Sequence, residues 1–456
     1  MDVILALQPW ATVLLAISLS FTIFLVLCLP TRHNPTAREK PRVVVLVLGD
    51  IGRSPRMQYH ALSIARKGGI VDLVGYNESQ PRPELLDSPS ITIRPLKTPP
   101  KMLDTSTPIK FIIYAPFKAI FQLASLLQML LYDIPDTAGY LLLQNPPAIP
   151  TLAVAKLVTV LRGQKLVVDW HNFGYSILGM KLGDHPIVWG SKLYELIFGR
   201  GADVNFTVTH SMNKHLRESW HLKMPIHTLY DRPPSHFQPF DATQRSDFLT
   251  SNPETAPYAA KLLSGQMKLV LSSTSWTADE DFSIFLQALV EYDRRAGSEN
   301  FLRPNSVPDL LVVITGRGPL RDGYIARIET LEFQYINVKS IWLEPEDYPK
   351  MIACADLGVS LHTSSSGMDL PMKVVDLFGV GVPVVAVRFA CVQELVKDGE
   401  NGATFTKAEE LATLLSRLFD SRRKRELEKL KEGAMKETKS RWDENWDKIA
   451  APVFGL

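Results

Sequence analysis

The stretch Cys354–Gly402 decides the fold class of this chain, because it reads strand, turn, helix and strand in that order. Residues 355–361 (ADLGVSL) are an apolar run typical of a buried strand, and a polar turn (HTSSSGMD) follows at 362–369. Pro371 stands where a helix would begin, a position that suits its fixed φ and missing N–H. A second apolar run, VPVVAV at 382–387, predicts a return strand. This order is typical of a parallel α/β sheet.

The helix start in this unit carries side chains that suit a nucleotide. Free N–H groups and the helix dipole favour an anion there. Lys373 can place its charge against a diphosphate, and Asp376, on the same face of the helix, can accept hydrogen bonds from ribose hydroxyls. We add Ser366 of the polar turn and Val374 to this predicted donor site. The alternative interpretation is an ordinary βαβ unit with a solvated lysine and aspartate.

The same stretch resembles the C-terminal, donor-binding half of the GT-B glycosyltransferases. Those enzymes often show Pro-x-Lys-x-x-Glu, followed by Gly-x-Pro-Val-Val. Here the pattern reads PMKVVD at 371–376 and GVPVV at 381–385, with Asp in place of Glu. The aspartate keeps the carboxylate but shortens its reach. The resemblance implies an α/β fold of two Rossmann-like, doubly wound parallel-sheet domains that face a cleft.

Length and composition agree with two domains. The chain has 456 residues and is 46% hydrophobic, which exceeds one ordinary core. A net charge of only +2 gives no indication of a nucleic-acid partner. Cys28, Cys354 and Cys391 are scattered, so they fit neither a disulfide framework nor a metal site and favour a reducing compartment.

Two series of alternating strand and helix patterns place the domain boundaries. The first series begins with the apolar run at 43–48, and the second begins at 269–271. A Pro/Ser/Gln-rich stretch at 230–257 between them is expected to be a linker with an insertion. A charged segment at 422–446 predicts a terminal helix, which in GT-B folds commonly crosses back onto the first domain. The expected parts are an anchor at 3–31, an acceptor domain at 41–235, a nucleotide-sugar domain at 258–420 and a C-terminal helix in 421–456.

The N-terminus predicts one membrane anchor. Trp10–Leu29 is nearly continuous apolar sequence, and about 20 residues span a hydrocarbon core of ~30 Å. A cleaved signal peptide is the alternative, but the chain begins Met1-Asp2 and lacks the basic start that such a peptide shows. Basic residues dominate 32–42, so the positive-inside rule places the rest of the chain in the cytosol.

A second apolar stretch, Phe111–Tyr132, contains Pro116 and Lys118 and is too interrupted for a second span. It predicts either a core helix or a helix that lies on the membrane surface, where a lipid-borne substrate would need docking.

Polar residues follow the first predicted strand in the sequence GDIGRS at 49–54. Gly49 and Gly52 can bring the backbone close to a bound group, and Arg53 with Ser54 at a helix start suits a phosphate. Asp50 would lie at the carboxyl edge of the strand and is the first candidate for a general base, because this loop often supplies the base in inverting GT-B enzymes. A plain Asx turn is the alternative.

Another strand ends in DWHNFG at 169–174. His171 is the second candidate for the base, or a hydrogen-bond donor, and Asn172 is predicted to contact the acceptor. A structural histidine is the alternative.

One more loop is predicted to contact the donor diphosphate, and another carries a run of acidic residues. Gly316 and Gly318 permit close approach, and Arg317 between them would act with Lys373 to stabilise a departing nucleoside diphosphate without a metal. The acidic run at 279–281 imitates an Asp-x-Asp metal motif. We assign it instead to a helix start, because Thr277 and Glu280 have the spacing of a capping box.

The resemblance becomes closer over five motifs: GDIGRSPRMQYH at 49–60, QNPP at 144–147, DWHNFG at 169–174, SSTSWTADEDF at 272–282 and HTSSSGMDLPMKVVD at 362–376. They are similar to the β-mannosyltransferases of the dolichol-linked pathway. This similarity implies GDP-mannose as donor, dolichyl-diphosphate-linked chitobiose as acceptor and inversion at the anomeric carbon. It also implies a single-pass protein of the endoplasmic reticulum membrane, with its catalytic domains in the cytosol.

No tightly bound cofactor is expected, and Mg²⁺ would act only through the substrate diphosphates. Other mannosyltransferases of the pathway are possible partners. Two alternatives stay open: a retaining GT-B α-mannosyltransferase of the same lipid-linked pathway, and a non-catalytic membrane scaffold subunit.

Overall fold

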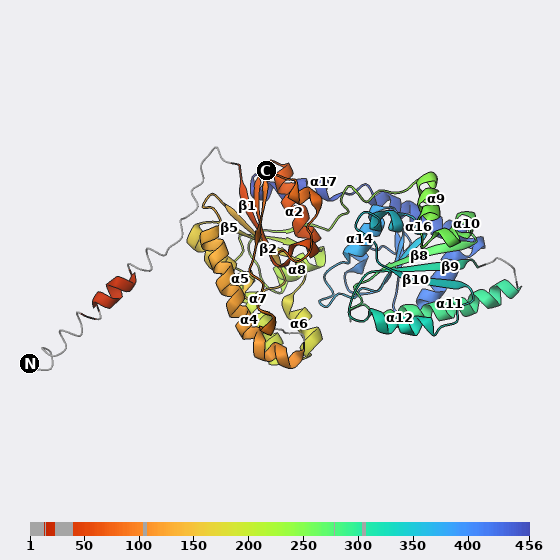
Figure 1. Cartoon of the computed structure of the whole chain (residues 1–456), viewed down its shortest axis with the longest axis horizontal. Helices are drawn as coiled ribbons and strands as arrows, with labels where there is room; N and C mark the ends of the chain where they lie inside the picture. Colours follow the sequence, from red (N-terminus) through yellow and green to blue (C-terminus); the bar gives the residue numbers. More distant parts are fainter. Residues whose placement is uncertain (1–12, 14, 23–39, 104–106, 278, 303–306) are drawn as a thin grey trace, which may run out of the picture. The chain divides into compact units, whose positions relative to one another are not determined.

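The computed structural model of the chain describes residues 13, 15–22, 40–103, 107–277, 279–302 and 307–456 (Figure 1). The anchor predicted at 3–31 lies almost entirely outside these residues, of which 13 and 15–22 are helical and exposed. Two compact units make up the chain, and each is described by itself: Met1–Val168 with Ser191–Val204 and Phe454–Leu456, and Asp169–Gly190 with Asn205–Val453.

The first sheet has the strand order β3-β2-β1-β4-β5-β6-β7 within the described residues. Val43 of β1 pairs in parallel with Val71 on one side and with Tyr140 on the other. The apolar run of β1 is almost fully buried, because helices cover both faces of a doubly wound sheet. Its strands are β1 (Arg42–Asp50), β2 (Ile70–Tyr76), β3 (Ile91–Pro95), β4 (Tyr140–Asn145), β5 (Lys165–Trp170), β6 (Val204–Thr207) and β7 (Ile226–Thr228).

The second sheet has the order β10-β9-β8-β11-β12-β13 in the part of the chain that is described. Its neighbouring strands pair in parallel, and the register aligns Leu271 of β8 with Val313 of β9 and with Gly358 of β11. Its strands are β8 (Met267–Ser273), β9 (Asp309–Thr315), β10 (Ile336–Ile341), β11 (Leu357–Ser360), β12 (Val384–Val387) and β13 (Gly402–Phe405).

Helices connect most of these strands, as a parallel sheet requires. Those of the first series are α2 (Pro55–Arg66), α3 (Pro83–Leu86), α4 (Pro108–Gln128), α5 (Thr151–Arg162), α6 (Gly174–Leu182), α7 (Pro186–Gly199) and α8 (His210–Glu218). Those that follow are α9 (Ala242–Ser251), α10 (Ala259–Ser264), α11 (Phe282–Leu302), α12 (Arg321–Glu329), α13 (Tyr348–Ala353), α14 (Met372–Gly379), α15 (Ala408–Phe419), α16 (Lys424–Glu437), α17 (Trp442–Ile449) and α18 (Ala451–Phe454). Short helical turns complete the chain at η1 (Ile51–Arg53), η2 (Lys101–Leu103), η3 (Met129–Asp133), η4 (Ala256–Tyr258), η5 (Val392–Glu394) and η6 (Ser421–Arg423).

The doubly wound α/β fold predicted from the sequence is confirmed, with local differences. The stretch at 230–257, expected to be a linker, contains α9, which starts at a capping box formed by Asp241 and Gln244. The single terminal helix expected at 422–446 is two helices, because α16 ends at Glu437 and α17 begins at Trp442.

Strand carboxyl ends position the predicted residues. Asp50 is the last residue of β1, and His171 follows β5 directly. In the second sheet, the loops after β8, β9 and β11 carry Ser275, Arg317 and the polar turn at 362–369. Open α/β sheets bind ligands at this edge, so the sequence-predicted residues lie where such a fold offers a site.

Candidate active site

Two loops at the carboxyl edge of the second sheet are fitted against each other. The Trp276 indole N–H donates to the Gly316 carbonyl at 3.2 Å. A Cβ at Gly316, where φ is +136°, would lie 1.8 Å from the Thr274 carbonyl oxygen, and one at Gly318 would lie 1.7 Å from that of Ser275. The sequence predicted these glycines to make room for a ligand. In the structure they make room for the neighbouring loop, and thereby fix the position of Arg317 between them.

Lys373 is held at the second residue of α14 by a buried carboxylate. Its ammonium lies 2.6 Å from Oε1 of Glu280 and donates to the Ser275 hydroxyl at 2.9 Å. Glu280 is only 3% exposed and also accepts hydrogen bonds from the Ser275 N–H, at 2.7 Å, and from the Thr274 hydroxyl. The lysine side chain remains 30% exposed, so a preorganised cation faces solvent at the helix start.

The capping role predicted for Glu280 is wrong, because its carboxylate turns inward to this lysine. Helix α11 begins at Phe282, and the carboxylate of Asp281 accepts a hydrogen bond from the Ser283 N–H at 2.9 Å.

Arg317 stacks on an aromatic ring. Its guanidinium carbon lies 4.0 Å from the centroid of Trp342, whose side chain is 51% exposed. A guanidinium stacked in this way keeps its charge and its in-plane donors, so it can still contact an anion from the edge.

His362 lies between two carboxylates in the polar turn. Its Nδ1 is 3.4 Å from Asp279, and its Nε2 is 3.2 Å from Asp369. Burial works against a charged imidazole, but the hydrogen bonds of the two carboxylates raise the pKa of His362 to about 9. The same contact with His362 lowers the pKa of Asp279 well below its usual value. The imidazole is therefore a cation at neutral pH.

The polar turn also binds Asn172, which the sequence assigned to the acceptor. The Asn172 amide donates to Asp369 at 3.0 Å and to the Ser365 hydroxyl at 3.1 Å, both within the second unit. Ser366, a predicted donor residue, accepts a hydrogen bond from the Met368 N–H at 3.2 Å and lies 3.3 Å from the Ser364 hydroxyl. These contacts organise the turn.

The other two predicted donor residues of α14 differ in exposure. Val374 is fully buried, so its side chain belongs to the core and only its backbone could contact a ligand. Asp376 is partly buried and accepts a hydrogen bond from the Tyr348 hydroxyl at 3.4 Å. Desolvation raises the pKa of Asp376 to about 7, so near neutral pH it exists in both protonation states.

Asp50, in the first unit, organises its own loop. Its Oδ1 accepts N–H groups of Gly52, Glu78 and Ser79 at 3.3, 3.1 and 3.0 Å. Burial works against ionisation, but these hydrogen bonds and that of the Ser79 side chain lower the pKa of Asp50. The other oxygen, Oδ2, is buried and lies 3.5 Å from Nε of Arg53.

The rest of this loop is equally tightly packed. A Cβ at Gly52 would lie 2.5 Å from the Ser79 carbonyl oxygen, so only glycine fits there. Ser54 donates its hydroxyl to the Asp50 carbonyl at 3.0 Å, whereas the Arg53 side chain is 82% exposed. Arg53 is the residue of this loop that is presented to solvent as a cation. Gly49 precedes Asp50 within β1.

His171 and Asp169 form a hydrogen-bonded pair after β5. Nε2 of His171 lies 2.8 Å from Oδ2 of Asp169, which is fully buried, while the histidine side chain is 23% exposed. A buried carboxylate that accepts from Nε2–H fixes the tautomer, so the Nδ1 lone pair is the acceptor of the ring. This is the arrangement of an oriented general base.

Sequence reasoning missed Glu280, His362, Asp369 and Tyr348. Glu280 pairs with a residue 93 positions away and Tyr348 with one 28 positions away, so no local pattern marks either of them. His362 and Asp369 lie seven residues apart in one polar turn. The polar composition of 362–369 was the one available signal, and it indicated the turn without indicating the pairing. In the described residues, no three His, Cys, Asp or Glu side chains are grouped as a metal site.

The chain is similar to known glycosyltransferases in a sequence profile and in fold. A profile described as "Glycosyl transferases group 1" matches residues 285–421. The crystal structure of HepE from Anabaena in complex with UDP and glucose has a TM-score of 0.62 at 13% identity, covering 92% of this chain and 100% of its own. Sucrose-phosphate synthase from Thermosynechococcus elongatus has a TM-score of 0.61 at 13% identity, covering 92% of this chain and 98% of its own. These two likenesses show the GT-B fold.

Sequence relatives are much closer. The chitobiosyldiphosphodolichol beta-mannosyltransferase of Mus musculus is 42% identical over 94% of this chain and 92% of its own length. The Homo sapiens protein of the same name is 41% identical over 91% of this chain and 93% of its own length. That of Yarrowia lipolytica is 41% identical over 98% of this chain and 94% of its own length. With this identity over nearly its whole length, the chain belongs to the chitobiosyldiphosphodolichol beta-mannosyltransferase family.

Proposed function

We propose that this protein transfers mannose from GDP-mannose to the 4-hydroxyl of the terminal N-acetylglucosamine of chitobiosyl-diphosphodolichol, with inversion to a β-1,4 linkage. The observation that carries the proposal is the likeness to relatives of that name over more than nine-tenths of both chains. The cation-bearing loops at the carboxyl edge of the second sheet are consistent with a leaving nucleoside diphosphate.

On this proposal, the donor diphosphate lies at the start of α14. Lys373 is already fixed by Glu280 and Ser275, so little side-chain freedom is lost when it meets a phosphate. Arg317 approaches from the loop after β9. Preorganised cations stabilise charge that develops on the diphosphate as the glycosidic bond breaks, and this is how metal-independent transferases can promote departure. A divalent cation would act through the substrate diphosphates.

Asp376 is proposed to receive the ribose hydroxyls of the donor. Its carboxylate is half-buried and accepts only a long hydrogen bond from Tyr348 in the described structure. Two vicinal hydroxyls would supply the donors that a buried carboxylate needs. Because desolvation raises the pKa of Asp376 to about 7, donor binding should strengthen as the pH rises through neutrality.

We assign the general base to His171. In direct displacement, a group beside the acceptor hydroxyl must take its proton as C1 is attacked. His171 is partly exposed and oriented by Asp169. Asp50, the first choice from the sequence, has one oxygen occupied by three N–H groups and the other buried, and its pKa is lowered. Asp50 is then a loop organiser that presents Arg53 to the acceptor diphosphate.

We further propose that the first unit rests on the membrane through α4, α5 and α7. These helices connect β3 to β4, β4 to β5 and β5 to β6, and right-handed crossovers place all three on one face of the sheet. Arg162 of α5 donates to the carbonyl oxygens of Leu130 and Ile134, directly after α4. At the amino end of α5, the Tyr194 hydroxyl of α7 donates to the Pro150 carbonyl at 3.0 Å.

The outer surface of these helices is apolar. On α4, Ile113, Phe117 and Ile120 have the spacing of one helix face and are 52%, 59% and 63% exposed. Leu193 and Ile197 on α7 are 39% and 54% exposed. Within the described residues, the segment Ile113–Asp133 alone is long and apolar enough to cross a membrane, and 11% of it is buried. Its contacts with α5 favour a helix that lies on the bilayer surface.

Charge on these helices suits an anionic bilayer. Lys110 and Lys118 of α4, Lys156 of α5 and Lys192 of α7 are basic, and α4 contains no acid. The acid of α7, Glu195, is buried and accepts a hydrogen bond from Asn145 at 3.0 Å. Lysines that flank an apolar face are typical of interfacial helices.

A cytosolic location of both units is proposed from the basic residues at 32–42. The sequence contains two N-glycosylation sequons, Asn77-Glu78-Ser79 and Asn205-Phe206-Thr207. Asn205 cannot report on topology, because it is buried and accepts a hydrogen bond from the Trp170 indole at 2.9 Å. Asn77 is exposed, and a glycan there would place the unit in the lumen and contradict the proposal. Other mannosyltransferases of the pathway are the proposed protein partners.

The test is an assay of the purified full-length protein with GDP-mannose and a lipid-linked chitobiose acceptor. The expected product is one hexose larger and loses that hexose to a β-mannosidase. A product that only an α-mannosidase cleaves would establish the retaining alternative. Absence of transfer, with intact folding and GDP-mannose binding, would favour a non-catalytic subunit.

A further inference from the structure

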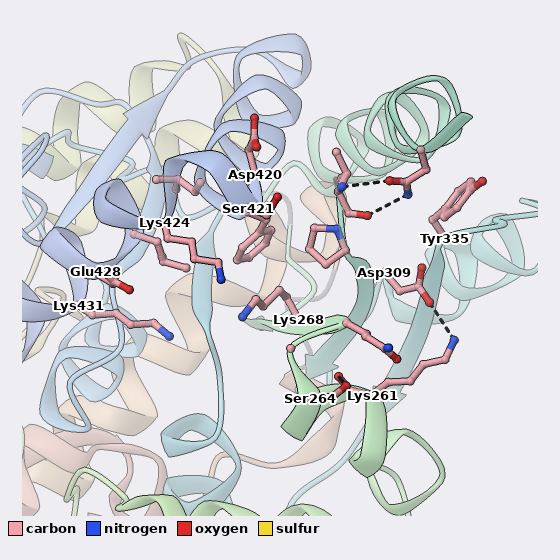
Figure 2. Close-up of a pocket in the computed structure, with 18 residues that line it drawn as sticks. Lys261, Ser264, Lys268, Asp309, Tyr335, Asp420, Ser421, Lys424, Glu428 and Lys431 are labelled. Carbon is pink, nitrogen blue, oxygen red and sulfur yellow. Dashed lines mark hydrogen bonds and ion pairs between the residues drawn. The ribbon is translucent and has the colours of Figure 1, made fainter. Parts of the chain in front are cut away.

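A second polar pocket lies at the opposite edge of the second sheet from the donor loops (Figure 2). It has a volume of about 600 Å³, and Lys268 and Asp309 line it near the amino ends of β8 and β9. Lys424 and Lys431 line it from α16. The seven residues of β8 separate this pocket from the loop that holds Ser275, which is roughly 20 Å at the rise of a strand. It is therefore no part of the proposed active site.

The pocket is lined by four lysines and three acids, so its lining is basic overall. Figure 2 shows the ammonium groups of Lys268, Lys424 and Lys431 directed toward one space between β8 and α16. Lys431 lies 3.1 Å and Lys268 3.9 Å from the carboxylate of Asp356. Asp356 also lies 3.3 Å from Arg245, so one carboxylate serves three cations.

The remaining acids of the pocket are largely engaged elsewhere. Asp309 pairs with Lys261 at 3.0 Å, and Asp420 accepts hydrogen bonds from the Arg422 guanidinium at 2.6 and 2.8 Å. Glu428, one turn after Lys424 on α16, is the other acid of the lining. Across the described residues, no ion pair includes the ammonium of Lys424, which is exposed at the first residue of α16.

A neighbouring surface extends the basic character. A second hollow shares Val307 and Asp420 with the pocket and is lined by Arg294, Arg295 and Arg417. The run Arg422–Arg425 joins the two hollows in sequence with four consecutive basic residues. These arginines are already paired with carboxylates, Arg294 and Arg295 with Glu291 and Arg417 with Glu426. They therefore have less charge to offer a further anion than the lysines of the first pocket.

We propose that this pocket binds a phosphate-bearing anion, with Lys268, Lys424 and Lys431 as its ligands. Three point charges from two elements can surround one phosphate group, and the start of α16, which has no side-chain cap, adds N–H groups with favourable dipole orientation. The volume admits a molecule of the size of a sugar phosphate or a phosphorylated lipid headgroup.

Calorimetric titration of the full-length protein in detergent with inorganic pyrophosphate tests the proposal. Chelator removes divalent ions, and the titration is run with and without excess GDP, so that binding at the donor loops is recognised separately. We expect a GDP-insensitive site whose affinity falls as salt is raised. Lys424→Gln and Lys268→Gln should each weaken it roughly tenfold, the effect of losing one charge-assisted hydrogen bond.

Lys429→Gln is the matched control, because Lys429 is exposed on the same helix and does not line the pocket. Equal affinity of Lys424→Gln, Lys429→Gln and the unmodified protein would overturn the proposal, as would the absence of GDP-insensitive binding. Vesicles of phosphatidylcholine, with and without phosphatidylinositol 4-phosphate, identify the source of the phosphate. If phosphatidylinositol 4-phosphate increases vesicle binding and Lys424→Gln loses that increase, the phosphate belongs to a lipid headgroup. If the lipid gives no increase although pyrophosphate binds tightly, the phosphate belongs to a soluble molecule.

Discussion

Nζ of Lys373 lies 2.6 Å from Oε1 of Glu280, a carboxylate that is only 3% exposed. The pair joins the first turn of α14 to the loop after β8, which are 93 residues apart in sequence. Because Glu280 is also held by the Ser275 N–H and the Thr274 hydroxyl, the lysine has a rigid partner. A cation placed in this way is oriented before any ligand arrives.

Lys373→Ala should therefore lower kcat/KM by ~2–4 kcal/mol of transition-state stabilisation, the scale of losing one preorganised charged donor. Steady-state kinetics with GDP-mannose measures the loss. Lys350→Ala is the control, because Lys350 is half-exposed on α13 and, within the residues that the structure describes, its ion pair is with the neighbouring Asp347. A Lys373→Ala enzyme with near-normal kcat/KM would remove this residue from the diphosphate site.

Arg317 offers a separate test of the same site. Arg317→Ala should also cost ~2–4 kcal/mol in kcat/KM if the guanidinium contacts the diphosphate. Its stacking on Trp342 is partly exposed and contributes only about 0.5–1 kcal/mol to stability, so the thermal midpoint should hardly move. Arg317→Lys keeps the charge but loses the planar stack, and it should recover part of the activity. Recovery in full would show that stacking is irrelevant, and an unimpaired Arg317→Ala would exclude the diphosphate contact.

The fold could be predicted from the sequence because its signals are local. The apolar runs of β1, β8 and β11, each followed by a polar turn, identify buried parallel strands without knowledge of their neighbours. The pairing of Lys373 with Glu280, and of His362 with Asp279, depends on which strands become adjacent. No residue spacing encodes that adjacency, so these contacts could not be predicted.

The same dependence on neighbouring strands explains why the contacts of Gly316, Gly318 and Asp50 differ from those expected. Gly316 and Gly318 were predicted to admit a ligand, yet the neighbouring loop at Thr274 and Ser275 occupies that space. Asp50 was correctly placed at the carboxyl end of β1, but two of the three N–H groups that it accepts come from residues 78 and 79, after another strand. Position along a strand was predictable, and the partners brought by the next strand were not.

His362 predicts a loss of stability at alkaline pH. Its pKa of about 9 in the folded protein exceeds the ordinary histidine value of about 6.5, so its stabilising charge is fully present below about pH 6.5 and is lost as the pH rises through about 9. The thermal midpoint of the protein should fall across this window, and in His362→Gln the fall should be smaller. An unchanged pH profile in His362→Gln would contradict a charged imidazole between Asp279 and Asp369.

Replacing the exposed apolar face of α4 should impair activity only toward acceptors with a long isoprenoid chain. Replacing Ile113, Phe117 and Ile120 together with serine removes exposed apolar surface and should leave folding intact, since exposed substitutions cost little. The KM for an acceptor with a long isoprenoid should rise at least tenfold, because burying even one such side chain contributes about 1.5–3 kcal/mol. With a short, water-soluble acceptor, kcat should not change.

Val290→Ser is the control for that experiment, because Val290 is a 44% exposed apolar residue on α11 in the second unit. An equal rise in KM in this control would mean that general hydrophobicity, and not the face of α4, binds the bilayer. A triple variant with unaltered KM for the long-chain acceptor would exclude docking through α4.

The last prediction separates the two candidate bases. His171→Ala should depress kcat by roughly 10²–10⁴-fold, the contribution of a positioned general base, while calorimetry shows little change in GDP-mannose affinity. Asp169→Asn should lower kcat in the same direction, because an amide facing Nε2 no longer fixes the tautomer that leaves Nδ1 free to accept. Asp50→Asn keeps an oxygen for the three N–H groups and removes only basicity, so it should turn over within a few-fold of the unmodified enzyme. If Asp50→Asn instead loses kcat as far as His171→Ala was expected to, with donor affinity retained, the base is Asp50. In that case its lowered pKa in the free enzyme must be relieved when the acceptor binds and the loop at 78–79 releases its N–H groups.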